Sequence, residues 1–471
     1  MHFAAINNYL FTLHSFFVVL GLIIYGVTSH IRKQRRHPSA SIAWIVLLFL
    51  LPYLALPMYL LIGTRKVLVQ RPWRTVGSTS QAPHHNENSA AIFQNLACAM
   101  QLPAAMSYGQ IFIHADGQDA LKRLRLTIEG AVQTLDVCTF LIGDDVLGDE
   151  IVDMLIKKAR SGVQVRLLVD GLGIYFGGKL GLKKLTSAGV RVELFGSPWR
   201  LPFMGRINLR NHRKMVIADG ERTWSGGRNL AAEYFIGDAA SKPPKSAWID
   251  LSFDFGEDLA RQSQWQFNQD WEFAIQSSKS NVSLPLEDSG SITKGGAQFI
   301  ASGPDQLDDT VYLLLISSCF RAKGRILAVT PYFVPDTTLL MALTLAARRG
   351  VKVDLLLPHK SNHLLADIAR HNALREMSNA GAQIWLLPTM IHAKAIIFDD
   401  EIVLTGSANL DERSLFLNYE MMIAFFQPSE INQFAHWIEN QKKFGKPYLS
   451  KPVNVYRDFV EGLVRWVAFQ L

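Results

Sequence analysis

One short pattern occurs twice in this chain with identical internal spacing. It reads His-x-Lys, four residues, Asp, six residues, then Gly-Gly or Gly-Ser, with an Asn at the same offset beyond. Each residue of the second copy lies 180 positions after its counterpart (392 − 212 = 180). A single match would be weak evidence, but two matched copies indicate an internal duplication. The copies are His212, Lys214, Asp219, Gly226, Gly227 and Asn229, and His392, Lys394, Asp399, Gly406, Ser407 and Asn409.

The duplication extends beyond the two motifs. A helix end, a glycine and an apolar strand at 160–169 have a counterpart at 348–357. In each half a second helix then ends in Ala-Gly, at 188–189 and 380–381, and a further strand follows. Strand-helix-strand-helix-strand order predicts an α/β fold with helices on both faces of a sheet. We expect two pseudo-twofold-related halves, each with a mixed, largely parallel sheet flanked by helices.

A pseudo-twofold interface would bring the two motifs to a common cleft. The side chains of His-x-Lys point the same way, because successive strand residues alternate faces. A plain strand with a polar loop would account for the apolar runs 215–217 and 395–398. It would not account for His and Lys repeated on one face. We therefore expect His212 and His392 to share one site.

The N-terminal region predicts a two-helix transmembrane hairpin. Residues 1–30 contain no Lys, Arg, Asp or Glu, and 41–63 form a second uncharged apolar run. At about 1.5 Å per residue, each run is long enough for a bilayer core of about 30 Å. A cleaved signal peptide is the alternative for the first run, but a basic n-region is missing and a second span follows. The turn between the runs carries Arg32, Lys33, Arg35 and Arg36.

Charge does not settle how the hairpin is oriented. Four basic residues lie in the turn, and Arg65, Lys66, Arg71 and Arg74 follow the second run, so the positive-inside count is equal. Both clusters could lie against anionic headgroups. The net charge of +7 favours an anionic partner, either phospholipid or nucleic acid.

Composition divides the chain into successive regions. The C-terminal segment has apolar residues on one helix side and could contact either the membrane or the core. The predicted regions are a hairpin with basic flanks (1–75), a linker (76–90), a first half (91–276), a second linker (277–296), a second half (297–450) and a C-terminal amphipathic segment (451–471).

The paired residues suit exchange at a phosphodiester. Lys214 and Lys394 supply positive charge for a five-coordinate transition state. One neutral histidine attacks phosphorus and forms a phosphohistidine, while the other, protonated, gives its proton to the leaving oxygen. These donors, without a carboxylate-rich cluster, predict a site that needs no metal ion and no other cofactor. The expected phosphate-binding residues are Asn229, Asn409, Ser407 and Gly227.

Four carboxylates have predicted supporting roles. Asp250 and Glu420 are isolated acids that enter apolar strands, and we expect them to orient the histidines through the far ring nitrogen. Plain charges at a strand edge are the alternative. Asp219 and Asp399 complete the catalytic motifs, and we expect them to fix the loop after the strand rather than touch substrate.

The paired motifs resemble those of the phospholipase D superfamily. Stretches 210–214, 330–336, 391–394, 406–411 and 414–420, together with the two apolar runs, resemble bacterial cardiolipin synthases of the phospholipase D type. The resemblance implies two phospholipase D-like halves in a multi-pass protein of the bacterial inner membrane. It also implies that two phosphatidylglycerols become cardiolipin and glycerol, with His212 as nucleophile and His392 as acid/base. A near-symmetric site also permits the reverse roles.

The same residues are compatible with other functions. They are phospholipase D hydrolysis, another phosphatidyl transfer, a nuclease of the same superfamily, and a membrane scaffold with an inactive site. A nuclease would be expected to have aromatic side chains that stack on bases beside a basic groove, and it would not need a membrane hairpin. Complete motifs in both halves argue against a scaffold. The expected partners are phosphatidylglycerol and other anionic membrane lipids, not nucleic acid.

Overall fold

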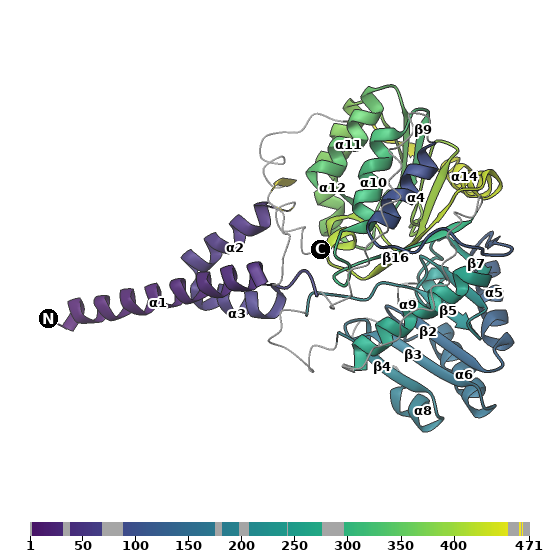
Figure 1. Ribbon diagram of the computed structural model, residues 1–471, viewed down its shortest axis with the longest axis horizontal. Helices are drawn as coiled ribbons and strands as arrows, with labels where there is room; N and C mark the ends of the chain where they lie inside the picture. The colour runs from purple at the N-terminus through teal and green to yellow at the C-terminus, as the bar shows by residue number, and fades with distance from the viewer. Residues whose placement is uncertain are drawn as a thin grey trace.

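The protein consists of a two-sheet globular part and a helical arm that projects from it (Figure 1). The arm contains three helices, and the globular part carries the two motifs. The computed structural model describes residues 2–31, 38–67, 88–174, 181–196, 207–242, 244–275, 296–450, 461–462 and 464.

The first half is built on a seven-stranded sheet of order β1-β7-β6-β5-β2-β3-β4. Its strands are β1 (Phe112–Ile113), β2 (Thr134–Thr139), β3 (Gln164–Asp170), β4 (Arg191–Phe195), β5 (Met215–Ala218), β6 (Arg222–Gly226) and β7 (Ser252–Gly256). Its helices are α5 (Gly117–Gly130), α6 (Val146–Arg160), α8 (Leu182–Ser187), the 3-10 turn η2 (Ala232–Tyr234) and α9 (Glu257–Ile275).

The second half repeats this plan on an eight-stranded sheet of order β17-β12-β11-β9-β13-β14-β16-β8. Its strands are β8 (Ala297–Ser302), β9 (Arg325–Val329), β11 (Lys352–Pro358), β12 (Gln383–Leu387), β13 (Ala395–Phe398), β14 (Ile402–Gly406), β16 (Glu420–Phe425) and β17 (Lys446–Pro447). A separate pair joins β10 (Phe333–Val334) to β15 (Leu410–Asp411). The helices are α10 (Thr310–Arg321), α11 (Thr337–Arg348), α12 (Leu364–Asn379), α13 (Glu412–Phe416) and α14 (Pro428–Lys442).

The sheets are mixed, as predicted, but the expectation of a largely parallel sheet is wrong. In the described parts of the two large sheets only β2-β3-β4 and β9-β11-β12 run parallel, and the motif strands β5 and β13 pair antiparallel on both sides. The reason lies in the turn after each motif strand. Asp219 and Gly220 both have positive φ and close β5 and β6 into a tight hairpin. So short a connection can join only antiparallel strands, and Asp-Gly between apolar runs is its sequence signal.

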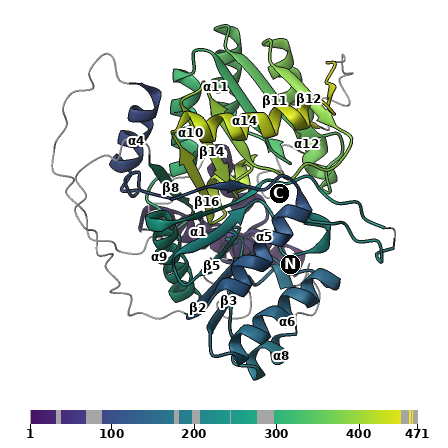
Figure 2. The same ribbon diagram turned by 90° about the vertical axis from the view of Figure 1, so that its right-hand side faces the viewer.

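Two apolar cores flank the first sheet, and one of them continues into the second half. On β2, Val137 faces the core under α5 and α6, whereas its neighbour Cys138 faces the shared core. In that shared core the ring of Phe253 lies 5.9 Å from Phe425 and 5.8 Å from Phe434, both of the second half. Figure 2 shows α5 and α6 in the first half and α14 across the second sheet. The halves are therefore joined by a continuous apolar interior.

Two reciprocal backbone contacts mark the seam between the halves. Asn211, just before the first motif histidine, pairs with Tyr419 of the second half. Ile391, just before the second motif histidine, pairs with Ile249 of the first half. Each half thus pairs its motif approach with the other half, which agrees with the expected pseudo-twofold relation.

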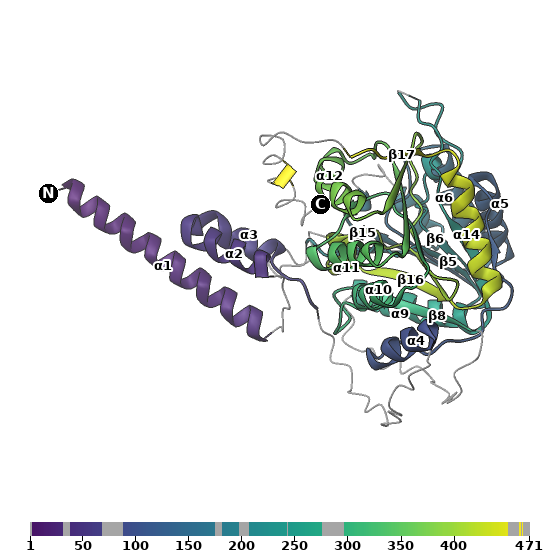
Figure 3. The same ribbon diagram turned by 90° about the horizontal axis from the view of Figure 1, so that it is seen from above.

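The arm differs from the predicted hairpin. Of the described residues, α1 (His2–Ile31) contains the one helical stretch, Phe11–His30, that is long and apolar enough to cross a membrane. The second apolar run is divided into α2 (Pro38–Leu50) and α3 (Pro52–Ile62), which pack on α1 (Figure 3). At about 1.5 Å per residue, neither short helix spans a bilayer core of about 30 Å. The break falls at Pro52, whose ring disfavours helical geometry in the preceding residue. A second full span, and hence a multi-pass protein, is not supported.

Two segments near predicted region boundaries pack on the second half. Helix α4 (Ser89–Ala99) falls mostly in the region assigned to the first half, yet it packs against α10 of the second. Glu461 is paired with Arg375 of α12 at 2.7 Å, so this part of the C-terminal segment packs on the fold. Linker 277–296, apart from its last residue, and most of 76–90 and 451–471 lie outside the described residues.

Candidate active site

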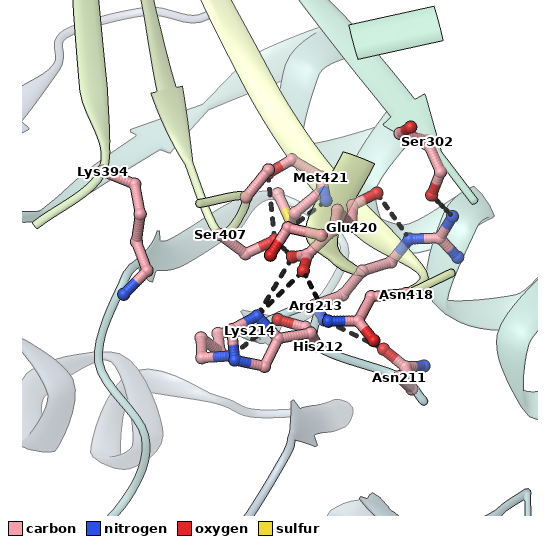
Figure 4. Close-up of polar contacts among 12 residues, drawn as sticks. Asn211, His212, Arg213, Lys214, Ser302, Lys394, Ser407, Asn418, Glu420 and Met421 are labelled. Atoms are coloured by element: carbon pink, nitrogen blue, oxygen red, sulfur yellow. Dashed lines mark hydrogen bonds and ion pairs between the residues drawn. The ribbon is translucent and has the colours of Figure 1, made fainter. Parts of the chain in front are cut away.

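The first motif lies at the seam, in the extended segment that precedes β5. Nδ1 of His212 lies 3.0 and 3.1 Å from the two carboxylate oxygens of Glu420, the first residue of β16 (Figure 4). The His212 side chain is 15% exposed and Glu420 is fully buried. A ring nitrogen facing an ionised carboxylate carries the proton, which leaves Nε2 with its lone pair for substrate.

The second motif has the same arrangement with the halves exchanged. Nδ1 of His392 lies 2.7 Å from Oδ2 of Asp250, which precedes β7 of the first half, and this histidine side chain is 4% exposed. Both predicted carboxylates therefore contact a motif histidine. Each carboxylate comes from the half opposite to its histidine, which position along the chain does not indicate.

The two lysines are buried beside the histidines. Nζ of Lys214 donates to the carbonyl of His212 at 2.7 Å. Nζ of Lys394 lies 2.7 and 2.9 Å from the two ring nitrogens of His392. Burial lowers the pKa of Lys214 to about 8 and that of Lys394 to about 7, against the attraction of the site carboxylates. Both remain able to carry positive charge near neutral pH.

Electrostatics favours neutral histidines beside ionised carboxylates. Burial and the charge of Lys394 lower the pKa of His392 to about 3, although Asp250 opposes the shift. Burial also lowers the pKa of His212. For Asp250 burial acts upward, but the charges of His392 and Lys394 outweigh it and bring its pKa to about 2. The charge of each motif lysine also acts on the histidine of the other motif. The two motifs therefore form one electrostatic unit.

The position after each motif glycine supports a carboxylate. At Gly227 a Cβ would lie 2.3 Å from Oδ1 of Asp250, so only glycine leaves room for that carboxylate. Its counterpart Ser407 donates its hydroxyl to Glu420. The backbone amides of both positions donate to strand carbonyls, at 3.0 Å for Gly227 and 2.9 Å for Ser407. These two residues thus accommodate or contact the orienting carboxylates, and phosphate binding by them stays a prediction.

The two motif asparagines are buried at the site with one amide atom unpaired. Nδ2 of Asn229 donates to the hydroxyl of Tyr234 at 2.9 Å, and Oδ1 has no partner. Oδ1 of Asn409 also has no partner. A buried polar atom without a partner is costly, and a bound ligand would relieve that cost. Rotating an amide by 180° would turn its N–H donors toward a phosphate.

The two motif aspartates lie at the far ends of their strands from the histidines. Each has positive φ, 55° at Asp219 and 51° at Asp399. Each accepts hydrogen bonds from three consecutive backbone amides of a neighbouring loop. They hold loops in place, as their predicted role requires, although the motif groups them with the catalytic residues. The donors are Val132, Gln133 and Thr134 for the first, and Lys323, Gly324 and Arg325 for the second.

Aromatic residues around the histidines were missed by sequence reasoning. Rings of Tyr234, Trp248 and Tyr332 lie 5.0, 5.6 and 6.5 Å from His392. Phe140 alone has a ring contact with His212, at 5.7 Å, within the described residues. Aromatic residues are ordinary in an α/β core, so their sequence signal was weak.

Comparisons with known proteins agree with the duplicated site. A family model described as cardiolipin synthase, PLD-like domain, matches residues 124–271 and 315–442, one stretch in each half. A model described as phospholipase D-nuclease N-terminal matches residues 21–63. The chain is 34% identical to the major cardiolipin synthase ClsA of Bacillus subtilis, over 86% of this chain and 87% of that protein. It is 31% identical to cardiolipin synthase A of Pseudomonas syringae, over 84% and 85%.

The fold also has a likeness among solved structures. Phosphatidylserine synthase of Haemophilus influenzae matches with a TM-score of 0.57 and 15% identity, over 82% of this chain and all of that chain. At that identity the likeness concerns the fold alone. The family model matches both halves, and two relatives are more than 30% identical over most of the chain. The chain therefore belongs to the bacterial cardiolipin synthases of the phospholipase D superfamily.

Proposed function

We propose that this protein is a phosphatidyltransferase that joins two phosphatidylglycerols into cardiolipin and releases glycerol. The observation that carries the proposal is the crossed pairing of His212 with Glu420 and of His392 with Asp250, beside two buried lysines. This arrangement supplies a nucleophile, a proton carrier and positive charge around one phosphate.

In the first half-reaction, Nε2 of His212 attacks phosphorus of the first phosphatidylglycerol. A P–N bond forms and the P–O bond to the headgroup glycerol breaks, while His392 gives its proton to that oxygen. Lys214 and Lys394 stabilise the charge on the nonbridging oxygens. The bound diester offsets the charge of Lys394, which raises the pKa of His392 toward the range that an acid needs.

In the second half-reaction, a headgroup hydroxyl of another phosphatidylglycerol attacks the phosphohistidine. His392 takes the proton of this hydroxyl, the P–N bond breaks, and cardiolipin leaves. One phosphodiester is broken and one is made, so no nucleotide is consumed. The chemistry uses only side chains of this chain, and we propose that no metal ion takes part.

The surroundings of the histidines support these roles. His392 is nearly buried among three aromatic rings, so its proton exchanges with a bound hydroxyl more readily than with bulk water. His212 is more open, and its lowered pKa keeps it neutral and nucleophilic.

We further propose a location in the bacterial inner membrane with α1 as the membrane-spanning element. An acceptor hydroxyl must compete with water at about 55 M, and a site held against dense phosphatidylglycerol headgroups favours the alcohol. Anionic lipids are then both the substrate and the surface that the protein occupies.

The test is synthesis by the purified protein with phosphatidylglycerol in EDTA. We expect equal amounts of cardiolipin and glycerol, and we expect His212→Ala to abolish an acid-labile phosphoenzyme. Loss of activity on chelation would contradict the metal-free site. A phosphoenzyme in His212→Ala but not in His392→Ala would reverse the two roles, and release of phosphatidic acid without cardiolipin would identify a hydrolase.

A further inference from the structure

The segment that follows the membrane arm is inserted into the second catalytic half. It comprises Gly63–Val67 and contains two basic residues, Arg65 and Lys66. Both belong to the basic flank that could lie against headgroups, but in the structure both side chains are buried. Their partners lie on the loop 303–309 between β8 and α10.

Lys66 is the centre of this contact. Its side chain is 3% exposed and its ammonium lies 2.9 Å from Oδ1 of Asp309. It also donates to the carbonyls of Gly303, Gln306 and Asp308 at 3.3, 3.0 and 3.4 Å. One buried ammonium thus binds three carbonyls and one carboxylate of a single loop, and these acceptors would lose a buried hydrogen-bond donor without it.

Arg65 and the next residue add to the attachment. Arg65 pairs with Asp309 at 2.6 Å, and its guanidinium lies 4.7 Å from the ring centre of Phe416. The amide of Val67 donates to the carbonyl of Pro304 at 2.8 Å. The loop is therefore held by the arm along most of its length.

The same loop adjoins the carboxylate that orients the first motif histidine. Ser302, at the end of β8, is the register partner of Glu420 on β16. Gly303 has φ of 149°, and a Cβ there would lie 3.0 Å from Cα of Tyr419. A shift of this loop would therefore displace the backbone that carries Glu420.

Arg213 holds the loop from the opposite side. It is fully buried between the two motif residues His212 and Lys214. It donates to the carbonyls of Glu420 and Ser302 at 3.0 and 3.1 Å and lies 3.5 Å from Oδ1 of Asp305 (Figure 4). The loop thus lies between Lys66, which follows the arm, and Arg213 of the first motif.

The end of α3 also reaches the approach to the first motif. The amide of Ile207 donates to the carbonyl of Leu61 at 3.3 Å. The next residue, Asn208, is held by Arg413 through its side chain at 3.0 Å and its carbonyl at 3.2 Å. The arm therefore contacts both chain segments that meet at His212.

We propose that Lys66 is a positioning residue for the first motif. By organising the loop 303–309 against Arg213, it keeps Glu420 in contact with His212, so the arm is part of the catalytic scaffold as well as an attachment. The proposal rests on the proposed function, since its readout is phosphatidyl transfer.

The test uses the full chain with Lys66→Met, which keeps the length of the side chain and removes its charge. In detergent micelles with saturating phosphatidylglycerol, we expect phosphoenzyme formation and kcat to fall at least tenfold, with KM within twofold. Amide hydrogen exchange should become faster in 303–309 and 418–420. The matched control is Lys184→Met, whose exposed partner is Asp153 at 2.6 Å, and we expect no change.

The outcomes separate this proposal from its alternatives. Unchanged phosphoenzyme formation in Lys66→Met would overturn it, as would a defect seen in vesicles but absent in micelles, because the latter indicates attachment alone. If Lys66→Met does not fold, Asp305→Asn keeps the buried ammonium of Lys66 and removes the carboxylate charge that faces Arg213. We expect that variant to slow phosphoenzyme formation severalfold, and wild-type rates would overturn the proposal. A wild-type protein that makes no cardiolipin would instead sink the proposed function.

Discussion

Each half holds a histidine, a lysine, an aspartate and an asparagine at matching places around equivalent strands, yet the two halves surround their histidines differently. His212 is 15% exposed and has one aromatic neighbour in the described structure, whereas His392 is 4% exposed and has three. Gly227 makes room for one carboxylate, and Ser407 donates to the other. A duplicated backbone thus places two equivalent histidines, and a few neighbouring side chains make their chemistry unequal.

The two motifs also differ in the residue between His and Lys. The first has Arg213, which is buried and joins both halves, and the second has Ala393 at the same place. One guanidinium therefore fixes the approach to His212 from within its own motif. On the His392 side, the absence of a side chain at Gly227 leaves the space that Asp250 occupies.

The largest expected effect comes from removing each orienting carboxylate charge in turn. Asp250→Asn and Glu420→Gln should each lower kcat on the order of a thousandfold, because the imidazolium formed during turnover loses its counter-charge. With a phosphatidyl ester of p-nitrophenol, whose leaving group needs no proton, phosphoenzyme formation should recover in Asp250→Asn but not in Glu420→Gln. Rapid-quench measurement of the phosphoenzyme checks this difference.

His392→Ala and His212→Ala serve as matched controls with the same ester. The first should behave like Asp250→Asn and the second should form no phosphoenzyme. Recovery in Glu420→Gln instead of Asp250→Asn would exchange the roles of the two halves.

A smaller effect should follow from altering the position after each motif glycine. Gly227→Ala places a methyl group within 2.3 Å of Oδ1 of Asp250, so we expect kcat to fall about a hundredfold as that carboxylate moves.

Ser407→Gly removes one hydrogen bond to Glu420, worth about 1.5 kcal/mol, so kcat should fall about tenfold. Steady-state kinetics with thermal melting separates misplacement from unfolding. Equal losses of kcat in Gly227→Ala and Ser407→Gly would show that the position after the motif glycine does not cause the difference between the two halves.

The smallest effect concerns pH. Burial brings the pKa of Lys394 to about 7 and that of Lys214 to about 8, and each lysine is cationic only below its pKa. Activity should therefore fall as pH rises. At one pH unit above the pKa of a lysine, about one tenth of that lysine stays cationic, so each lysine lowers activity about tenfold there. Arginine stays charged over this pH range. Lys394→Arg should therefore remove the fall in relative activity that begins near pH 7, whatever the kcat of this variant at neutral pH. Wild-type activity that is constant up to pH 9.5 would contradict the lowered values.

Local patterns predicted much of the fold and of the site. The 180-residue offset predicted the duplication, and strand patterning predicted the parallel pairs β3-β4 and β11-β12. The isolated acids Asp250 and Glu420 were correctly expected to contact the histidines. The antiparallel hairpins were missed, although Asp219-Gly220 signalled one of them. The division of the second apolar run at Pro52 was missed because hydropathy alone does not register a helix break.

What the sequence by itself determined was the inventory of the site: two imidazoles, two ammonium groups and two carboxylates, each at the start or end of an apolar strand. Only the tertiary structure decided the partners. His212 and Glu420 lie 208 residues apart, His392 and Asp250 142 apart, and Lys66 lies 243 residues before Asp309. Spacing along the chain encodes backbone periodicity within an element. Which carboxylate faces which histidine depends instead on how two separately formed sheets pack across the seam, and that packing is a property of surfaces assembled from the whole chain.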